Sequence, residues 1–337
     1  MKIAILNPTF SKFSGIDRLI EQNLKKFKQE GHEVTIFCFE ADITTNLAKV
    51  EVLGMPSSPT AQRLYRLFFF LFKNKINNIV NKLKGFDTVI AHLYPMTLVA
   101  AKAKKKFNIK YIYHDAGIAY PKLFRKLSER IYLRLFSYFS NKSIKSADEF
   151  IFISDFLRQE LKNKIGVDGK VEYVPVDKKR FHKNVKPGNI IKKYNLTSPI
   201  LLYVGRISPH KNVHGLIQSF NIVKKQFPSA SLVIVGKPTI DSYKKELKAL
   251  APQGVTFTGF VPDEVLPYYY ASCDLYVTAS LWEGFDIPIV EAELCGKKTV
   301  SYDIGSHKEV VKDGILVKDL NPEALAREIM NTLEQKK

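Results

Sequence analysis

Two glutamates on either side of a predicted helix start are the residues of this chain best suited to chemistry. Glu283 lies in a loop beside Gly284 and Phe285, and Glu291 follows eight positions later. Pro288 favours a first helical turn between them, because its fixed φ suits that place and its missing N–H is not needed there. The free N–H groups of a helix N-terminus attract anions, and carboxylates accept hydrogen bonds from hydroxyls. The stretch therefore predicts a ligand that carries both hydroxyls and phosphates, as a nucleotide-sugar does.

A second loop carries two cations at the end of a predicted strand, Ile200–Val204. Arg206 follows Gly205 directly, and Lys211 comes after a short polar stretch. The planar donor fork of arginine and the compact charge of lysine both suit a diphosphate. A solvated loop in a lysine-rich protein is the alternative interpretation of these cations, and a helix-capping acid is the alternative for Glu283.

Three residues of the first half also lie at predicted strand or helix ends. Gly15 opens a predicted helix, where the missing Cβ lets the backbone approach a diphosphate. His114 ends a predicted strand, and Asp115 beside it would either orient the ring or cap the next segment. A turn glycine and a structural histidine are the alternatives, and His92, at another strand end, is more typical of a structural residue.

Strands and helices alternate along the chain, which predicts parallel sheets covered by helices. A stretch rich in Lys, His, Asn, Pro and Gly from Asp177 to Gly188 separates two such series and predicts a linker. We therefore expect an α/β protein of two Rossmann-like, doubly wound domains, 1–180 and 181–337, that face each other across a ligand-binding cleft. The predicted strands are Ile3–Leu6, Val34–Cys38, Thr88–Ala91, Tyr111–Tyr113, Phe150–Ile153, Val171–Val174, Ile200–Val204, Leu232–Val235, Val255–Phe257, Leu275–Thr278, Thr299–Ser301 and Ile315–Val317.

Composition narrows the class of protein. With 337 residues and a hydrophobic fraction of 45%, the chain is long enough for two globular domains. No apolar run approaches the roughly 18 residues that span a bilayer. The 3 cysteines are scattered, which is typical of a reducing compartment, and neither a Cys/His cluster nor an Asp-x-Asp pair predicts a metal site. These features favour a cytoplasmic protein that needs no bound metal.

The formal net charge of +19 is concentrated in the first half. Residues 61–146 contain 18 Lys and Arg against 3 acidic residues. Basic segments 62–84 and 102–145 are also rich in aromatics, which predicts contact with an anionic membrane surface. A buried helix with a solvated basic rim is one alternative. Nucleic acid is another possible partner of such a surface, but no recognised nucleic-acid-binding module is present.

The order and spacing of the motifs resemble those of the retaining family-4 glycosyltransferases of the GT-B fold (glycosyl transferases group 1). The similarity extends from about residue 1 to 335. It rests on these stretches: Ser14-Gly15-Ile16-Asp17-Arg18, Gly31-His32-Glu33-Val34, Tyr113-His114-Asp115, Ala147-Asp148-Glu149-Phe150 with Ser154, Gly205-Arg206 with Lys211-Asn212, Phe257-Thr258-Gly259-Phe260-Val261, Glu283 with Glu291, and Gly305-Ser306-His307-Lys308-Glu309.

The resemblance implies roles for individual residues. Arg206 and Lys211 would bind the donor diphosphate and offset its growing charge, Glu283 would hold sugar hydroxyls, Glu291 the ribose, and His114 would face the donor sugar. The implied catalytic residues are thus His114, Glu283, Arg206 and Lys211. The implied donor-binding residues are Gly15, Gly205, Arg206, Lys211, Phe260, Val261, Glu283, Gly284, Phe285, Asp286, Ile287 and Glu291.

Two of the departures from the family pattern lie in the predicted donor site. Asp286 stands where glycine is usual, so it would either select among sugar hydroxyls or cap the following helix. Ser14 replaces the first of two usual glycines, which affects how the loop before Gly15 approaches the diphosphate.

The expected function is that of a retaining, metal-independent transferase. It would move a hexose from a UDP- or GDP-sugar, its co-substrate, to a lipid-linked or cell-surface glycan acceptor at the inner face of the cell membrane, without a cofactor and without nucleic acid. The family generally retains configuration by a front-face route, in which the departing phosphate oxygen takes the acceptor's proton. A catalytically silent carbohydrate-binding protein of the same fold and a basic nucleic-acid-binding protein are the alternatives.

Overall fold

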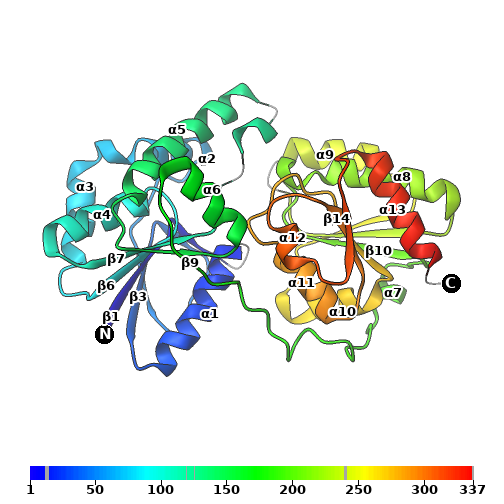
Figure 1. Cartoon of the computed structure of the whole chain (residues 1–337), viewed down its shortest axis with the longest axis horizontal. Coiled ribbons are helices and arrows are strands. Elements are labelled where there is room, and N and C mark those ends of the chain that lie inside the picture. The colour runs from blue at the N-terminus through cyan, green and yellow to red at the C-terminus, as the bar shows by residue number, and fades with distance from the viewer. Residues whose placement is uncertain (12–14, 119, 125, 239–240, 336–337) are drawn as a thin grey trace. The chain divides into compact units, whose positions relative to one another are not determined.

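The computed structural model describes residues 1–11, 15–118, 120–124, 126–238 and 241–335. It divides the chain into two compact units (Figure 1). The first contains Met1–Pro121 and Lys126–Pro175, and the second contains the residues from Val176 onward with the short segment 122–124. The division falls after Pro175, whereas the sequence places it after residue 180.

The first unit is built on a parallel sheet of 7 strands in the order β5-β3-β1-β6-β7-β8-β9. Its strands are short apolar runs such as Ile3–Leu6, which is buried throughout, as expected for strands covered on both faces. The strands are β1 (Lys2–Leu6), β3 (Glu33–Cys38), β5 (Lys49–Val52), β6 (Thr88–Ala91), β7 (Lys110–Asp115), β8 (Glu149–Phe152) and β9 (Lys170–Val171), with a separate pair β2 (Thr9–Phe10) and β4 (Glu40–Ala41). The helices are α1 (Gly15–Gln29), α2 (Pro59–Leu67), η1 (Phe69–Leu71), α3 (Lys73–Lys82), α4 (Met96–Phe107), η2 (Pro121–Leu123), α5 (Leu127–Ile144) and α6 (Asp155–Ile165).

The second unit repeats the plan with a parallel sheet of 6 strands in the order β12-β11-β10-β13-β14-β15. It has its own core, which includes Leu201, Phe220 and Leu232, all buried. The strands are β10 (Ile200–Val204), β11 (Ser231–Val235), β12 (Val255–Gly259), β13 (Leu275–Thr278), β14 (Thr299–Tyr302) and β15 (Gly314–Val317). The helices are α7 (Ile190–Lys193), η3 (Pro209–Lys211), α8 (Val213–Gln226), α9 (Asp241–Leu250), η4 (Asp263–Val265), α10 (Leu266–Ser272), α11 (Ile287–Leu294), α12 (His307–Val310) and α13 (Pro322–Glu334).

Each sheet has a point where the strand order reverses direction. In the second unit, β10 leads outward to β11 and β12, while its other neighbour, β13, leads outward to β14 and β15. In the first unit the same reversal lies between β1 and β6. The loops that leave these neighbouring strands diverge, and ligands of open α/β sheets bind in the space that results. Each unit therefore has one preferred place for a ligand, outside the carboxyl ends of these strands.

Some predicted boundaries were wrong. The predicted strand Val171–Val174 ends at Val171 in the structure, and the predicted helix Glu264–Ala271 is a 3₁₀ turn followed by α10. β5 was missed because its residues, Lys-Val-Glu-Val, are at most half-buried and lack an apolar run. No helix in the described part of the chain is both long enough and apolar enough to cross a membrane.

Candidate active site

The loops after β10 and β13 meet at the reversal point of the second sheet. The Leu281 N–H donates to the His210 carbonyl at 2.8 Å, which joins the two loops directly. The loop after β14 is joined to them as well, because the Ser306 N–H donates to the Glu283 carbonyl at 3.3 Å. Gly305 allows this contact, since a Cβ there would lie 2.3 Å from the Glu283 carbonyl oxygen. Three strand ends thus hold Glu283 in place.

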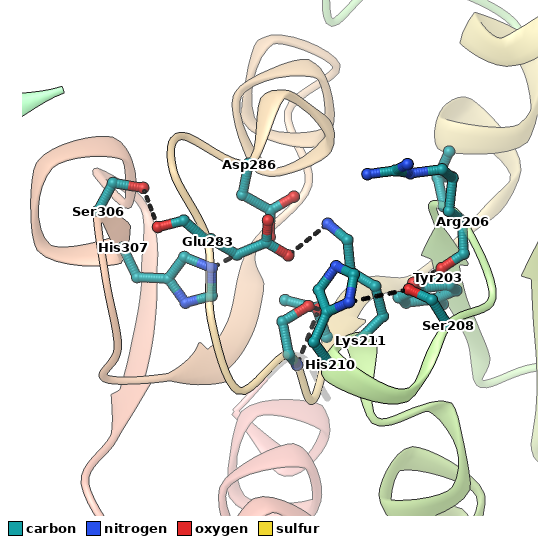
Figure 2. Close-up of polar contacts among 12 residues, drawn as sticks. Tyr203, Arg206, Ser208, His210, Lys211, Glu283, Asp286, Ser306 and His307 are labelled. Carbon is teal, nitrogen blue, oxygen red and sulfur yellow. Dashed lines mark hydrogen bonds and ion pairs between the residues drawn. The ribbon is translucent and has the colours of Figure 1, made fainter. Parts of the chain in front are cut away.

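Lys211 and Glu283, both predicted from the sequence, contact each other. The Lys211 Nζ lies 2.5 Å from Glu283 Oε1 (Figure 2), and their side chains are only 14% and 7% exposed. In this structure each side chain therefore neutralises the other. Glu283 does not act as a helix-capping acid, because its carboxylate accepts from the lysine.

Asp286 occupies the N-cap position of α11 but does not cap it with its side chain. Its φ is +66°, in the left-handed region that glycine favours, so this position suits a glycine as well. The side chain instead contacts His307, whose Nε2 lies 3.0 Å from Asp286 Oδ2. The capping alternative for Asp286 is therefore wrong.

His307 is an imidazolium held by two acceptors. Its Nδ1 lies 2.7 Å from the Tyr302 carbonyl oxygen, which can only accept, so this nitrogen carries a proton. Its Nε2 lies 3.0 Å from Asp286 Oδ2, and because the pKa of Asp286 is held below its usual value the carboxylate is ionised and can only accept, so this nitrogen carries a second proton. The ring is fully buried, and its charge is compensated at close range (Figure 2).

The pKa shifts agree with this arrangement. Burial alone lowers the pKa of His307, but the hydrogen bond and charge of Asp286 outweigh it and the pKa is raised. Burial raises the pKa of Asp286, but Lys211 and His307 together hold it below its usual value. The pKa of Glu283 is raised by burial and by the charge of Asp286, against the opposing effect of Lys211. Two cations and two carboxylates therefore form a buried charge cluster, Lys211, Glu283, Asp286 and His307, whose charges cancel.

Glu283, Asp286 and His307 place ligand atoms within 4.8 Å of one another, so a metal ion must be considered. A metal needs a free lone pair on the imidazole, but both ring nitrogens of His307 donate hydrogen bonds. The Lys211 ammonium already lies against the Glu283 carboxylate where a cation would be bound. The donor set therefore fits the lysine better than a metal.

Arg206 is the uncompensated cation at this sheet edge. It is exposed, and no hydrogen bond or ion pair joins its guanidinium to any residue that the structure describes. The buried Tyr203 hydroxyl donates to the Arg206 carbonyl at 3.1 Å and fixes the loop backbone. A Cβ at Gly205 would lie 2.8 Å from this Tyr203 hydroxyl oxygen, so glycine at position 205 leaves room for the ring. In Figure 2 the Arg206 side chain extends from the same loop as Lys211.

The other predicted donor-binding residues surround this loop cluster. Glu291 is buried in α11, and one of its carboxylate oxygens accepts from the Tyr270 hydroxyl at 2.7 Å. Phe260 lines a pocket of about 510 Å³ at the ends of β11 and β12, together with Gly236 and Lys237. The remaining predicted residues, Val261, Gly284, Phe285 and Ile287, are buried or half-buried beside these groups.

In the first unit, His114 is the residue before the end of β7 and is 3% exposed. Its Nε2 is buried and has no hydrogen-bond partner within the described ranges. Burial lowers the pKa of His114 to about 4, so the ring is neutral at neutral pH. Asp115 does not orient this ring, since it accepts from the Tyr113 hydroxyl and the Gly117 N–H. His92 has the structural role expected of it, because its Nδ1 donates to the His114 carbonyl at 3.1 Å.

The loop before Gly15 is only partly described. Ser14 lies outside the described residues, while Gly15 begins α1 as predicted. The buried Asp17 accepts from Asn7 Nδ2 and from both the N–H and the hydroxyl of Ser11, which ties the end of β1 to the start of α1. Burial raises the pKa of Asp17 to about 6.

Two residues of the second-unit site escaped the sequence analysis. His307 lies in one of the motifs quoted above, Gly305-Ser306-His307, but nothing in the sequence shows that its ring reaches Asp286. The acid at position 286, where glycine is usual, is the signal that could have suggested a cationic partner for it nearby. Tyr270, the partner of Glu291, lies in an apolar helical stretch and offered no such signal.

Comparison with known proteins identifies the family. The model named Glycosyltransferase Family 4 matches residues 13–176, and the model named Glycosyl transferases group 1 matches residues 189–337. The chain belongs to the GT-B glycosyltransferases. The predicted fold class is confirmed by solved GT-B structures that are similar to this glycosyltransferase.

Three relatives illustrate the similarity. O-antigen chain mannosyltransferase B of Escherichia coli is 31% identical over 215 residues, which cover 58% of this chain and 54% of that protein. The N,N'-diacetylbacillosaminyl-diphospho-undecaprenol alpha-1,3-N-acetylgalactosaminyltransferase of Campylobacter jejuni is 29% identical over 214 residues, again 58% and 54% of the two chains. The alignments thus span about half the length of these curated relatives. The structure of Anabaena HepE in complex with UDP and glucose has a TM-score of 0.78 at 22% identity and covers 100% of this chain and 90% of its own, which shows the shared fold.

Proposed function

We propose that this GT-B glycosyltransferase moves a hexose from a UDP- or GDP-sugar to a lipid-linked or cell-surface glycan acceptor, with retention of configuration and without a metal. The observation that carries the proposal is the buried charge cluster beside the uncompensated Arg206, at the reversal point of the second sheet. A nucleotide-sugar presents a diphosphate for the free cation and hydroxyls for the carboxylates.

The surroundings of the two predicted cations, Arg206 and Lys211, suggest different roles for them. Arg206 has no carboxylate partner in the described residues, so its full charge is free to oppose the negative charge that develops on the leaving diphosphate. Lys211 is shared with Glu283, so it would hold the position of that carboxylate while contributing a smaller part to the diphosphate. Both effects come from protein cations, which supports a metal-independent reaction.

Retention is best explained by a front-face substitution. A double displacement needs a carboxylate nucleophile below the anomeric carbon, and the two carboxylates of the cluster are each engaged by a cation. In the front-face route the bond from the anomeric carbon to the phosphate oxygen breaks and the bond to the acceptor oxygen forms on the same face. The acceptor's hydroxyl proton passes to the departing phosphate oxygen. His114, neutral and with an unpartnered Nε2, stays the predicted catalytic residue of the first unit.

The proposals for the acceptor and for the membrane location do not depend on the donor site. The printed names of the two relatives refer to an O-antigen chain and to a diphospho-undecaprenol-linked sugar. In this chain the basic aromatic segments 62–84 and 102–145 carry exposed apolar residues, including Leu71 at 64% and Tyr138 at 64% exposure. We therefore place the protein at the inner, anionic face of the cell membrane.

A thermal-shift panel of UDP-, GDP- and ADP-sugars tests the donor. A donor at about 100 times its Kd stabilises the folded state by about 2.7 kcal/mol, so the correct nucleotide-sugar should raise the Tm while the others do not. The same donor should give a product with unchanged anomeric configuration by NMR, at a rate that excess EDTA does not alter. Absence of any shift and of any transfer with all three donors would overturn the proposal, and a rate restored only by added divalent metal would overturn its metal-independent form.

A further inference from the structure

A second pocket, of about 920 Å³, lies in the first unit between α4 and α5, and none of the predicted catalytic or donor-binding residues lines it. These helices lie side by side (Figure 1). Its volume is at the upper end of the range that binds small molecules in proteins, about 300–1,000 Å³. Nothing in the proposed transfer reaction uses it.

The floor of the pocket is apolar. Leu98 and Ala101 of α4 face Phe139 of α5, and Tyr94 and Phe70 complete the wall. The rings are packed in place, with centroids 4.7 Å apart for Phe70 and Phe139 and 6.0 Å apart for Tyr94 and Phe139. This is a preformed apolar surface.

The rim is basic and contains no acid. Five lysines line the pocket, and no Asp, Glu, Asn or Gln side chain does. Lys104 is held by Asp148 Oδ1 at 2.6 Å and by the Ser146 carbonyl at 2.8 Å. The other four are exposed and, within the described ranges, make no side-chain hydrogen bond or ion pair: Lys102, Lys105, Lys142 and Lys145.

This combination selects a class of ligand. A sugar needs carboxylates or amides for its hydroxyls, and the pocket offers none of them. The serines at its edge bond within the protein, Ser143 Oγ to Thr97 Oγ1 at 2.7 Å and Ser146 Oγ to the Ser143 carbonyl at 2.9 Å. An apolar floor below unpaired ammonium groups fits a molecule with a hydrocarbon body and an anionic head. Lysines suit this use because their stems lie along apolar surface while their charges stay in water.

Exposed apolar side chains continue from the pocket and favour a lipid surface over nucleic acid. Leu71 and Phe72, next to Phe70, are 64% and 44% exposed, and Tyr138 on α5 is 64% exposed. A nucleic acid would leave Leu71 in water, whereas a membrane interface would bury it.

We propose that this pocket binds one anionic phospholipid of the membrane surface, with an acyl chain against Leu98, Ala101 and Phe139 and the phosphate among the four unpaired lysines. The proposal deepens the membrane-surface part of the proposed function and is independent of the donor site.

The test is titration of the 337-residue chain with dioctanoyl phosphatidylglycerol below its micellar concentration, by calorimetry and native mass spectrometry. We expect binding of one molecule, and at least tenfold weaker binding of dioctanoyl phosphatidylcholine, which keeps the chains, and of glycerol phosphate, which keeps the phosphate. Equal affinity for the two phospholipids, or for glycerol phosphate, would overturn the proposal.

Two variants probe the two halves of the pocket. Ala101→Trp fills the floor, and the combined Lys102→Gln, Lys105→Gln, Lys142→Gln and Lys145→Gln variant removes the rim charges. Each should weaken binding at least tenfold. The matched control removes the same charge from exposed lysines of the second unit, Lys178, Lys179, Lys183 and Lys186, and should bind as the unmodified chain does. Unchanged affinity in the rim variant contradicts the proposal even if Ala101→Trp does not fold.

Competition identifies the occupant and separates this proposal from the proposed function. Displacement of the phospholipid by a lower concentration of farnesyl phosphate, or of a single-stranded oligonucleotide, would overturn the choice of occupant. The Tm shift caused by the nucleotide-sugar should be the same in the pocket variants as in the unmodified chain. If a variant loses lipid binding while the nucleotide-sugar still raises its Tm by the same amount, the substitution has affected the pocket and not the donor site.

Discussion

At the scale of single residues, the site of the second unit is governed by how four buried charges are paired. Lys211 and Glu283 form one pair, and His307 and Asp286 form the other. Removing one partner of a buried pair leaves an uncompensated charge, which is more costly than removing both. Arg206 is outside these pairs, so its loss should affect catalysis without affecting the fold.

The first prediction compares Arg206→Ala with Lys211→Ala. Arg206→Ala should lower the rate of sugar transfer by about 100-fold or more, the usual effect of removing one transition-state donor, and should leave the Tm unchanged. Lys211→Ala should lower the rate as well, and should also destabilise the fold by about 3 kcal/mol because Glu283 stays buried without its partner. Transfer rates and denaturant unfolding of both variants provide the check.

The double variant Lys211→Ala with Glu283→Ala is the control for that interpretation. It should recover much of the stability lost in Lys211→Ala, since no unpaired charge remains, but none of the transfer. Near-normal transfer in Arg206→Ala, or equal stability of the single and double variants, would contradict the assignment.

The second prediction concerns pH and His307. Because its folded pKa is raised above its unfolded value of about 6.5, the folded state holds a proton that the unfolded state loses first. Its contribution to stability is complete below pH 6.5 and is lost as the pH rises through the folded pKa. In that interval the contribution of His307 to the free energy of unfolding should fall by up to about 1.4 kcal/mol per pH unit.

Urea unfolding between pH 6.5 and 8 measures this slope, with His307→Gln as the comparison. Burial lowers the pKa of His92 to about 3, that of His114 to about 4 and that of His210 to about 3, so these rings bind protons near pH 6.5 only in the unfolded state and make stability rise with pH there. Both proteins share that contribution, so the difference between their free energies of unfolding isolates His307. His307→Gln should be less stable at pH 6.5, and the difference should shrink as the pH rises. The same slope in both proteins would show that His307 is not charged.

The residue scale also shows what the sequence could predict. The pairing of a cation after one strand with an acid after another was foreseeable, because adjacent parallel strands bring their carboxyl ends together. The protonation of His307 was not, since it depends on a carbonyl at Tyr302 and a carboxylate at Asp286 that become neighbours only when two loops meet.

At the scale of elements, the position of Glu283 depends on how closely the loops after β13 and β14 approach each other. Gly305 has a φ of +51°, and a Cβ there would lie 2.3 Å from the Glu283 carbonyl oxygen. Backbone cannot move aside as a flexible side chain would, so a larger residue must displace the loop that carries Glu283.

The third prediction is that Gly305→Ala destabilises the protein and weakens donor binding together. The matched control is Gly166→Ala at the end of α6, where φ is +74° but no atom lies within 4 Å of the added Cβ. The control should lose about 1–2 kcal/mol from the left-handed conformation alone, with donor affinity unchanged. Gly305→Ala should lose clearly more and should bind the nucleotide-sugar at least tenfold more weakly, as measured by unfolding and calorimetry. Equal effects of the two variants would show that the close approach is unimportant.

Elements with a continuous apolar run were predictable, and those without one were not. β10 and β13 have the predicted bounds, because Ile200–Val204 and Leu275–Thr278 are fully buried runs between polar loops. β5 carries Lys49 and Glu51 and is stabilised by pairing with β3 rather than by its own hydrophobicity. Pairing of this kind is a property of the assembled sheet and leaves little trace in the strand itself.

At the scale of the whole molecule, the two units differ in how their charged residues are arranged. The second unit cancels its buried charges pair by pair, whereas the first concentrates exposed lysines around an apolar pocket. The sequence showed the excess of +15 in residues 61–146, from 18 basic and 3 acidic residues, but not that helices α4 and α5 place lysines around one cavity. That arrangement required the packing of the two helices.

The last prediction is that membrane binding has a salt-sensitive and a salt-resistant part. Added salt shortens the screening distance from about 10 Å at 0.1 M to about 3 Å at 1 M, so it weakens the attraction of exposed lysines to an anionic leaflet. The burial of exposed apolar residues such as Leu71 and Phe72, 64% and 44% exposed, is not screened. Cosedimentation with phosphatidylglycerol vesicles should therefore fall as salt is added but keep a residual bound fraction. The double variant Leu71→Ser with Phe72→Ser should lose this residual fraction. The control Leu320→Ser, at a residue of the second unit that is 50% exposed, should keep it. Binding abolished by salt in the unmodified chain would mean that the apolar residues do not enter the membrane, and binding insensitive to salt would mean that the lysines do not face it.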